Sequence, residues 1–333
     1  MKKLTLLSIA HFCVDMCCAA LFFGYLAQGA DWWLSMVVYN ACAFALQLPL
    51  GLMADRANRN LPFAAAGCLL VAGSFLITGT PLLAAIVAGL GNGMFHVGGG
   101  LEVLNSSKKS APLGVFVSPG ALGLYLGTAG ASLLARYGWT MPLLMILTGL
   151  GILTIGRAGG TLISENAPLS LDLQKRDELP LLCLFLVVAL RSMLGSGAFA
   201  TGLSCLPGIV PVLCLALGKA AGGFVGDRLG LRQTAALSLA AAATLLLLPR
   251  GYVTLAALFL FNMTMPLTLF EAARLMSEAK GAAFGLLTSA LFVGMLPRFA
   301  GLVPALPAYA WAGLVLLSLG LLWIGLEKEA ARG

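Results

Sequence analysis

The sequence predicts an all-α polytopic membrane protein whose twelve transmembrane helices form two pseudo-symmetric bundles of six. Three observations lead to this prediction. Of the 333 residues, 60% are hydrophobic and only 10% are charged, whereas soluble domains are about a quarter charged. Twelve apolar segments approach the length of about 20 residues that a helix needs to cross a bilayer. A short charged motif occurs at equivalent places in the two halves of the chain.

The apolar segments divide the chain into two halves. They cover residues 4–28, 32–54, 61–79, 81–104, 112–135, 138–157, 179–198, 204–226, 232–249, 252–275, 282–297 and 301–325. The longest polar stretch, RAGGTLISENAPLSLDLQKRDELP, follows the sixth segment. We therefore expect an N-terminal six-helix bundle at 1–157, a cytoplasmic linker at 158–178 and a C-terminal six-helix bundle at 179–333.

The basic residues indicate the orientation of the chain, because cytoplasmic loops of membrane proteins are enriched in lysine and arginine. If the N-terminus is cytoplasmic, the outer loops hold only Arg136, Arg250 and Arg298. The inner loops and ends then hold fifteen of the 20 basic residues: Lys2, Lys3, Arg56, Arg59, Lys108, Lys109, Arg157, Lys175, Arg176, Arg228, Arg232, Arg274, Lys280, Lys328 and Arg332. We expect a multi-pass protein of the bacterial cytoplasmic (inner) membrane, with both termini in the cytoplasm.

An internal repeat relates the two halves. GLMADRANR (Gly51–Arg59) ends the second segment, and GFVGDRLGLR (Gly223–Arg232) ends the eighth. The two glycines are 223 − 51 = 172 positions apart, and the same distance separates Asp55 from Asp227. Two homologous halves of six helices are typical of secondary transporters.

The repeated motif predicts a gate at the cytoplasmic ends of the helices. Glycines at 51 and 223 allow two helices to approach closely. The aspartates that follow can pair with basic residues or face the positive N-terminus of a neighbouring helix. Arginines of the motif can engage acids on other helices, for which Glu102 and Glu271 are the candidates. The charged residues of the predicted gate are Asp55, Arg56, Arg59, Glu102, Asp227, Arg228, Arg232 and Glu271. Alternatively, these charges only set orientation and lie solvated in loops.

Polar residues deep in the bilayer predict a substrate site, because such residues are costly there and usually functional. Residues four apart share a helix face. His11 and Asp15 have this spacing in the first segment, and Asn92 and His96 have it in the fourth. The strongest candidates fall on segments one, four, seven and ten: His11, Asp15, Asn92, His96, Arg191 and Asn262.

His96 lies in the glycine-rich stretch GLGNGMFHVGGG and allows four interpretations. A phosphate-binding loop is excluded, because such loops require a preceding strand or a G-K-[ST] ending. His96 could be a packed structural residue, or a metal ligand together with His11 and Asp15. We favour a cavity residue that binds substrate or protons, since histidine titrates near neutral pH. Asp15 and His96 are the candidates for proton coupling, and no metal site or cofactor is assigned.

Arg191 predicts the charge of the substrate. A permanent charge at mid-membrane needs a counter-ion, and Asp15 is the expected internal partner. An anionic substrate would compete for Arg191, after which Asp15 could take up a proton. The alternative is a static Asp15–Arg191 pair that holds the halves in register. Lys219, on the eighth segment, is expected to snorkel to the cytoplasmic surface.

The motif G-x-x-x-D-R-x-x-R, in the first half, and its copy in the second half resemble the signature of the major facilitator superfamily. The first copy has Asn58 where the family usually has glycine, and the second keeps Gly230 but carries its last arginine, Arg232, one place later. Within that superfamily, GMFHVGGG and GVFVSPGALGLYLGTAG are similar to stretches of the fosmidomycin-resistance type of exporter. Val97 stands where that group has proline, and Gly127-Thr128 stands where it has Gly-Pro. The resemblance implies the major facilitator fold, in which helices one, four, seven and ten line a central cavity.

The predicted function is secondary active transport of a small organic solute, anionic or zwitterionic, by alternating access with protons as the coupling ion. Two alternatives remain: a divalent-metal transporter using His11, Asp15 and His96, and an intramembrane enzyme using the same groups. An enzyme is disfavoured because its chemistry does not require a two-half repeat. We expect a monomer that contacts the lipid bilayer and binds no nucleic acid.

Overall fold

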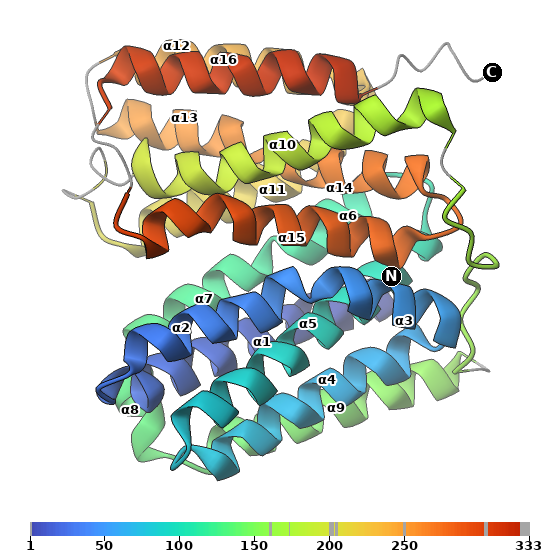
Figure 1. The fold of residues 1–333 in the computed structure, drawn as a ribbon, viewed down its shortest axis with the longest axis vertical. Coiled ribbons are helices and arrows are strands. Elements are labelled where there is room, and N and C mark those ends of the chain that lie inside the picture. The colour runs from blue at the N-terminus through green and yellow to red at the C-terminus, as the bar shows by residue number, and fades with distance from the viewer. Residues whose placement is uncertain are drawn as a thin grey trace.

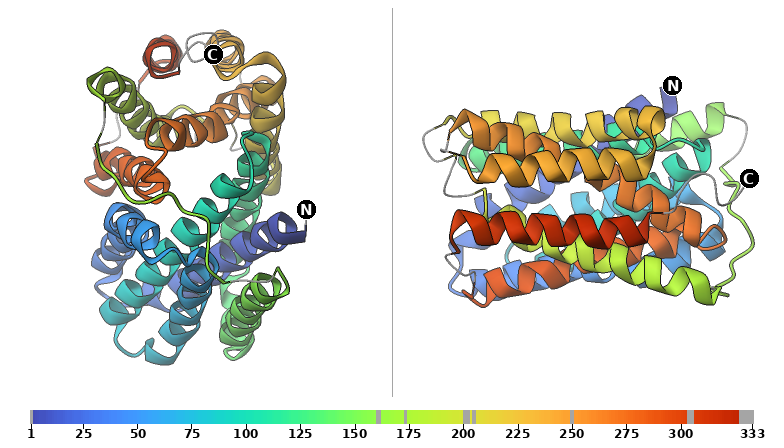
Figure 2. Two further views of the ribbon diagram at one scale, coloured as in Figure 1. Left: turned by 90° about the vertical axis from the view of Figure 1, so that its right-hand side faces the viewer. Right: turned by 90° about the horizontal axis from the view of Figure 1, so that it is seen from above.

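The computed structural model describes residues 2–159, 162–172, 174–199, 203, 206–248, 251–302 and 306–326. Every regular element among these residues is a helix. The helices form two groups stacked along the long axis of the molecule, with α1–α9 in one group and α10–α16 in the other (Figures 1 and 2). Helices α6 and α7 of the first group extend towards α11 of the second (Figure 1).

The first group contains six membrane crossings, some of which are broken into two helices. Its helices are α1 (Lys2–Gly24), α2 (Trp32–Asn40), α3 (Gln47–Ala57), α4 (Asn60–Ser74), α5 (Pro81–Ser106), α6 (Ala111–Val117), α7 (Pro119–Ala129), α8 (Ala131–Arg136) and α9 (Thr140–Ala158). A π-helical segment at Ala41–Ala45 joins α2 to α3. Proline lacks an amide hydrogen, and Pro119 marks the break between α6 and α7.

The second group also contains six crossings. Its helices are α10 (Lys175–Gly197), α11 (Ile209–Leu229), α12 (Leu231–Leu246), α13 (Tyr252–Asn262), α14 (Thr264–Leu275), α15 (Lys280–Phe299) and α16 (Ala308–Gly325). Helices α13 and α14 together make one crossing. The break between them precedes Pro266, which cannot donate a hydrogen bond to the carbonyl of Asn262.

Eleven of these helices or joined pairs are long and apolar enough to cross a membrane, and Leu231–Leu246 is a shorter apolar helix. The prediction of a twelve-helix membrane protein is therefore confirmed. Two predicted starts are too early. The twelfth helix begins at Ala308 rather than near 301 because Pro307 has an extended backbone at its N-cap. The eighth begins at Ile209, directly after Pro207 and Gly208.

The start of α1, the segment 162–172 and the end of α16 lie at the same end of the helices, as an even number of crossings requires (Figure 1). The assignment of that end to the cytoplasm stays a prediction, as do the bundle boundaries at 157 and 179. Helix α10 begins at Lys175, inside the predicted linker. Arg250, Lys328 and Arg332 lie outside the described residues.

Glycines bring the two groups together, as the repeated motif predicted. A Cβ atom at Gly51 of α3 would overlap the backbone of Gly281 in α15. At the equivalent place, a Cβ atom at Gly223 of α11 would lie 2.7 Å from the Cα of Ala111 in α6. Backbone-to-backbone contact of this kind requires the absence of a side chain. Two helix pairs, α3–α15 and α6–α11, therefore form the contact between the halves.

Candidate substrate site

A cavity of about 260 Å³ lies between the two halves. Most of its walls are apolar, and a few polar side chains converge on it, which is the usual composition of a small-molecule site. His11, Asp15, Gln47 and His96 come from the N-terminal half. The C-terminal half contributes Arg191, Lys219, Thr268 and Thr288.

On the N-terminal side, His11, Asp15 and His96 form one cluster. His11 Nε2 lies 3.3 Å from Asp15 Oδ2, and His96 Nε2 lies 3.6 Å from Asp15 Oδ1. The two histidine Nε2 atoms are 2.9 Å apart. The i, i+4 spacing in α1 places His11 and Asp15 on one face, and α5 supplies His96.

Main-chain carbonyls orient both imidazole rings. His11 Nδ1 lies 2.8 Å from the carbonyl oxygen of Phe116, and His96 Nδ1 lies 2.9 Å from that of Asn92. A carbonyl oxygen only accepts hydrogen bonds, so both Nδ1 atoms carry the hydrogen. In the neutral rings, each Nε2 is then an unprotonated acceptor. The Asn92 amide donates to Asp15 Oδ1 at 3.3 Å and to Cys18 Sγ at 3.5 Å.

On the C-terminal side, Arg191 is buried among neutral groups. It is 8% exposed. Its guanidinium donates to the hydroxyl oxygens of Thr264 at 2.6 Å and Thr268 at 3.4 Å. Those hydroxyls donate in turn to the main-chain carbonyls of Phe261 and Met265, which leaves their lone pairs for the guanidinium. The buried Arg191 Nε has no hydrogen-bond partner among the described residues.

The predicted Asp15–Arg191 ion pair is not formed. Asp15 lies beside two histidines of its own half and accepts a hydrogen bond from Asn92, whereas Arg191 donates to two threonines of α14. The expectation that Lys219 snorkels to the surface is also wrong, because Lys219 lines the central cavity. Within the described part of the chain, no carboxylate oxygen lies within 4.0 Å of the charged nitrogens of Arg191 or Lys219.

The two predicted asparagines do not line the cavity. Asn92 lies behind the cluster and positions Asp15. Asn262 donates to the carbonyl of Leu258 in its own helix at 2.8 Å and packs against Gly218 of α11. Gln47 was not among the predicted site residues, yet its buried Oε1 has no partner among the described residues. A glutamine inside an apolar segment was the signal that could have identified it.

The glycine-rich stretch around His96 is a packed part of α5. Gly91 contacts Gly67 of α4 so closely that a Cβ atom would lie 2.7 Å from the Gly67 oxygen. Gly98 packs in the same way against Asn60 and Ala64. These glycines therefore bring α4 against α5, and the exclusion of a phosphate-binding loop is consistent with this continuous helix.

Two aspartates join the halves at the end of the interface where the linker lies. Asp55 of α3 accepts hydrogen bonds from the amides of Gly281 and Ala282, each at 2.9 Å, at the start of α15. Asp227 of α11 accepts from the amides of Ser110 at 2.7 Å and Ala111 at 3.0 Å, at the start of α6. Each carboxylate crosses between the halves and satisfies orphan amides at a helix N-terminus.

The predicted partners of Glu102 and Glu271 are wrong. Glu102 pairs with Lys3 at 2.6 Å, and Glu271 pairs with Arg274 at 2.8 Å. Both carboxylates find a basic residue within their own half, so the gate arginines are not required. Arg232 instead stacks over Trp323 and donates to its carbonyl oxygen. No ion pair of Arg56, Arg59 or Arg228 is formed within the described ranges.

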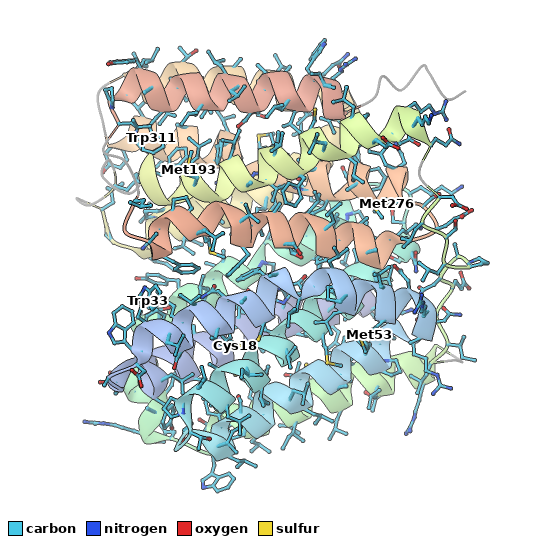
Figure 3. The ribbon with its side chains drawn as sticks, viewed as in Figure 1. Cys18, Trp33, Met53, Met193, Met276 and Trp311 are labelled. Atoms are coloured by element: carbon cyan, nitrogen blue, oxygen red, sulfur yellow. The ribbon has the colours of Figure 1, made fainter. Side chains whose placement is uncertain are left out.

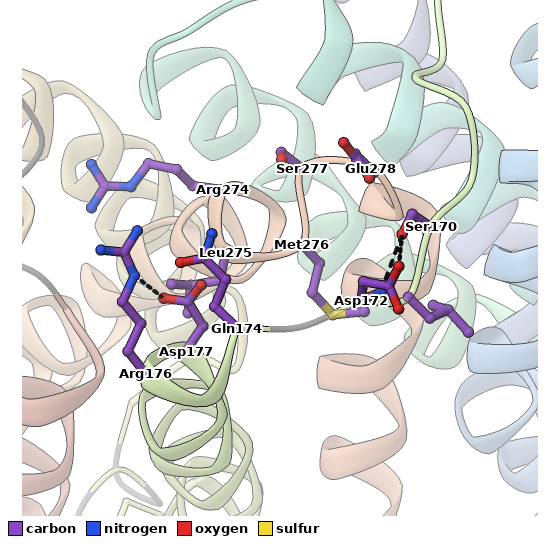
Figure 4. A pocket seen from close by; sticks show the side chains of 11 residues that line it. Ser170, Asp172, Gln174, Arg176, Asp177, Arg274, Leu275, Met276, Ser277 and Glu278 are labelled. Carbon is purple, nitrogen blue, oxygen red and sulfur yellow. Dashed lines mark hydrogen bonds and ion pairs between the residues drawn. The ribbon is translucent and has the colours of Figure 1, made fainter.

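The linker is fastened to the N-terminal half. Asn58 has a left-handed backbone (φ 49°), its carbonyl accepts from the Ser164 amide at 2.8 Å, and its side chain accepts from the Asn166 amide at 3.0 Å. Asn166 also exchanges hydrogen bonds with the Asn60 side chain. A polar pocket further along lies between the linker and the α14–α15 loop (Figure 4), and it shares no lining residue with the central cavity.

At the opposite end of α15, the halves touch again. The indole of Trp33 in α2 donates to the carbonyl oxygen of Phe299 at 3.2 Å (Figure 3). Near mid-helix, the Ser289 hydroxyl donates to the carbonyl of Ala45 in the π-helical segment at 3.0 Å. Helix α15 is therefore held against the second crossing along its length.

Comparison with known proteins identifies the fold. No protein-family profile and no curated protein sequence matches the chain. The E. coli fucose:proton symporter FucP is similar in structure, with a TM-score of 0.68 at 13% identity over 98% of this chain and 99% of that chain. The human organic anion transporter MFSD10 gives a TM-score of 0.68 at 17% identity, over 96% of this chain and 99% of that chain.

A bacterial homologue of the iron transporter ferroportin, in an outward-facing state, gives a TM-score of 0.63 at 15% identity, with 98% of both chains covered. FucP in its outward conformation is described as a major facilitator superfamily transporter. The similarity to the fosmidomycin-resistance type of exporter stays a prediction. The chain therefore has the fold of major facilitator superfamily transporters.

Proposed function

We propose that the protein is a secondary transporter of a small organic anion or zwitterion, and that it works by alternating access between its two halves. The observation that carries the proposal is the pair of cations in the central cavity. Arg191 and Lys219 come from the same half and line the same space, and neither has a carboxylate partner among the described residues. A cavity between two repeated halves is where secondary transporters bind substrate.

A negatively charged ligand resolves the electrostatic imbalance of this cavity. Two uncompensated cations inside a membrane-spanning bundle are unfavourable, because the surroundings cannot solvate them as water does. A carboxylate, phosphonate or phosphate group can accept hydrogen bonds from the guanidinium fork of Arg191 and attract Lys219 at the same time. The unpartnered Arg191 Nε provides one further donor for such a group.

Proton coupling is assigned to Asp15 and His96, which face the same cavity from the other half. Histidine changes charge near neutral pH and can exchange its proton with whichever side of the membrane the cavity faces. A proton on the cluster and an anion on Arg191 attract one another, so each favours the binding of the other. This electrostatic link couples the two solutes without direct contact between their sites.

Alternating access is assigned to the two aspartate caps. In this structure they join the halves at the end where the linker lies. Opening that end requires both carboxylates to leave the helix N-termini. Opening the other end requires the Trp33–Phe299 contact to break.

The test begins with thermal-shift screening of the purified protein against carboxylates, phosphonates and phosphates, with neutral and cationic compounds as comparison sets. Hits are then measured by counterflow of labelled solute in proteoliposomes, which an enzyme does not produce. We expect anionic or zwitterionic hits whose affinity falls in Arg191→Lys. If a neutral or cationic ligand binds best and Arg191→Lys binds it equally well, the proposed substrate class is wrong.

A further inference from the structure

We propose that His11, Asp15 and His96 form a binding site for a divalent transition-metal ion. One ligand atom from each residue lies within 4.8 Å of the others. Two imidazole nitrogens and one carboxylate oxygen form a common ligand set of protein zinc, iron and cobalt sites. The three side chains come from α1 and α5, two helices whose backbones are fixed by packing.

The spacing of the ligand atoms matches an ion at their centre. A tetrahedral ion with bonds of about 2.1 Å holds neighbouring ligand atoms about 3.4 Å apart. The two Nε2 atoms are 2.9 Å apart, His11 Nε2 lies 3.3 Å from Asp15 Oδ2, and His96 Nε2 lies 3.6 Å from Asp15 Oδ1. One ligand atom from each residue lies within 4.8 Å of the others, so side-chain adjustment without movement of the helices brings the three ligand atoms to an ion.

The hydrogen bonds around the cluster leave the correct lone pairs for coordination. Both Nδ1 atoms are committed to main-chain carbonyls, so both Nε2 lone pairs point into the cluster. At 2.9 Å, two such lone pairs repel unless a cation lies between them. Metal-bound histidines almost always donate their other ring nitrogen in this way, and metal-bound carboxylates are held by a further hydrogen bond. Asn92 supplies that bond to Asp15.

Gly120 lets α7 pack directly against the cluster. A Cβ atom at this residue would overlap both His11 Nε2 and Asp15 Oδ2, so the glycine backbone covers that side of the ligand atoms. His11, Asp15 and His96 all line the central cavity, which leaves the cavity side of the cluster open. An ion with three protein ligands keeps such an open fourth position.

The open position faces the cavity that holds Arg191 and Lys219. If the proposed anion site is correct, one carboxylate arm of the solute can complete the coordination of the ion while another contacts these cations. The substrate class is then a small metal-chelating carboxylate, bound together with its ion. The metal site itself does not depend on this extension.

Isothermal titration calorimetry of the detergent-purified full chain with Zn²⁺ tests the site, with Mg²⁺ as the control because it prefers all-oxygen ligands. Co²⁺ serves as a second probe, since a site of low coordination number gives it strong visible absorption. We expect one Zn²⁺ per chain, no comparable Mg²⁺ binding and an intense Co²⁺ spectrum. These measurements need no transport, so they stand or fall separately from the proposed function.

Four variants locate the ion. Asp15→Asn and His96→Gln are expected to abolish the one-site isotherm. Asn92→Ala keeps all three ligands and is expected to weaken Zn²⁺ about 10–100-fold, as the loss of an outer hydrogen bond does. Gly120→Ala is expected to weaken Zn²⁺ at least as much, because the added methyl group would displace His11 Nε2 and Asp15 Oδ2. Gly73→Ala is the matched control, because no atom lies within 4 Å of the added methyl group.

Two results would overturn the proposal. One is Zn²⁺ binding that is equal in wild type and His96→Gln, which would assign the heat to the buried cysteines or to the surface. The other is a wild-type chain that gives no Co²⁺ absorption, which would leave a proton between the two histidines. The wild-type spectrum and Gly120→Ala decide the matter even if a ligand variant fails to fold.

Discussion

At the scale of single residues, the cavity separates its charges by half. The acid and both histidines belong to the N-terminal half, and both cations belong to the C-terminal half. Asp15 is held by neighbours in its own bundle and leaves Arg191 to neutral hydroxyls. The cationic side is thus prepared for a ligand, because no protein carboxylate among the described residues has to be displaced before an anion binds.

Arg191→Lys tests whether the guanidinium of Arg191 binds the anionic ligand. A lysine ammonium keeps the charge but cannot reproduce a bidentate contact. Losing one hydrogen bond to a charged group costs about 1.5–3 kcal/mol, so we expect the Kd for an anionic ligand to rise roughly 10–150-fold. Lys219→Gln removes charge without touching the guanidinium and is expected to weaken the same ligand by a smaller factor. Equal affinities in wild type and Arg191→Lys would make Arg191 a structural residue.

Asp15→Asn and His96→Gln test the coupling. Both replacements remove a proton-binding group while keeping similar size. In buffers without added divalent metal, we expect counterflow to persist and accumulation driven by an imposed pH gradient to disappear, because exchange of solute does not require net proton movement. Wild-type transport that ignores the pH gradient would contradict proton coupling directly. Uptake is measured in proteoliposomes with and without the gradient.

At the scale of helices, the two halves meet through pairs that combine glycine contact with an aspartate cap. Gly51 and Asp55 of α3 both contact the start of α15, and Gly223 and Asp227 of α11 both contact the start of α6. The glycine allows the close approach, and the approach brings the carboxylate within reach of the orphan amides. The sequence repeat therefore corresponds to a repeated structural unit, which consists of one glycine contact and one aspartate cap.

Asp55→Asn and Asp227→Asn are expected to favour opening at the linker end. Losing a helix cap costs about 1 kcal/mol, which corresponds to roughly a fivefold shift between two conformations. We expect normal expression, slower counterflow and faster labelling of an Ala121→Cys variant from the linker side by a membrane-impermeant thiol reagent. Asp172→Asn, an exposed linker acid, is the matched control. Unchanged initial rates in both cap variants would contradict a conformational role.

Gly51→Ala tests the glycine half of the unit. The methyl group meets the backbone of Gly281, which cannot move independently of α15. Overpacking of this kind typically costs about 1–3 kcal/mol, so we expect a lower Tm in a thermal-shift experiment. Gly73→Ala adds the same methyl group into open space and should leave the Tm near that of wild type. A Gly51→Ala protein that melts with the wild type would show that close approach is dispensable.

At the scale of the whole molecule, hydrophobic length was sufficient to predict the crossings. For the two aspartates, the sequence left open whether they pair with basic residues or cap a neighbouring helix. It was insufficient for the rotation of each helix about its axis. Asn262 and Arg191 are both polar residues within apolar segments. Asn262 nevertheless turns towards α11, whereas Arg191 faces the cavity. Lys219 lies eight residues before Asp227, and in the fold α11 packs against α6 with Lys219 lining the cavity.

The same limit explains the histidine cluster. No short spacing joins His96 to His11 or Asp15, since the residues are 85 and 81 positions apart in the chain. Their convergence depends on how α1 and α5 are placed by their neighbours: glycines of α7 pack against α1, and glycines of α5 pack against α4 and the second crossing. A sequence pattern reveals ligands on one helix, whereas ligands that meet across a packed interface require the fold.

Asn58 has a consequence for how far the halves can move. Asn58 holds Ser164 and Asn166 against the N-terminal half through hydrogen bonds. The first part of the linker therefore cannot extend when the two halves move apart. The linker beyond this attachment runs from Asn166 to the start of α10 at Lys175. Nine residues span at most about 32 Å when fully extended, compared with about 60 Å for the whole stretch from the end of α9. Asn58 therefore limits how far the C-terminal half can move away from the N-terminal half at the linker end.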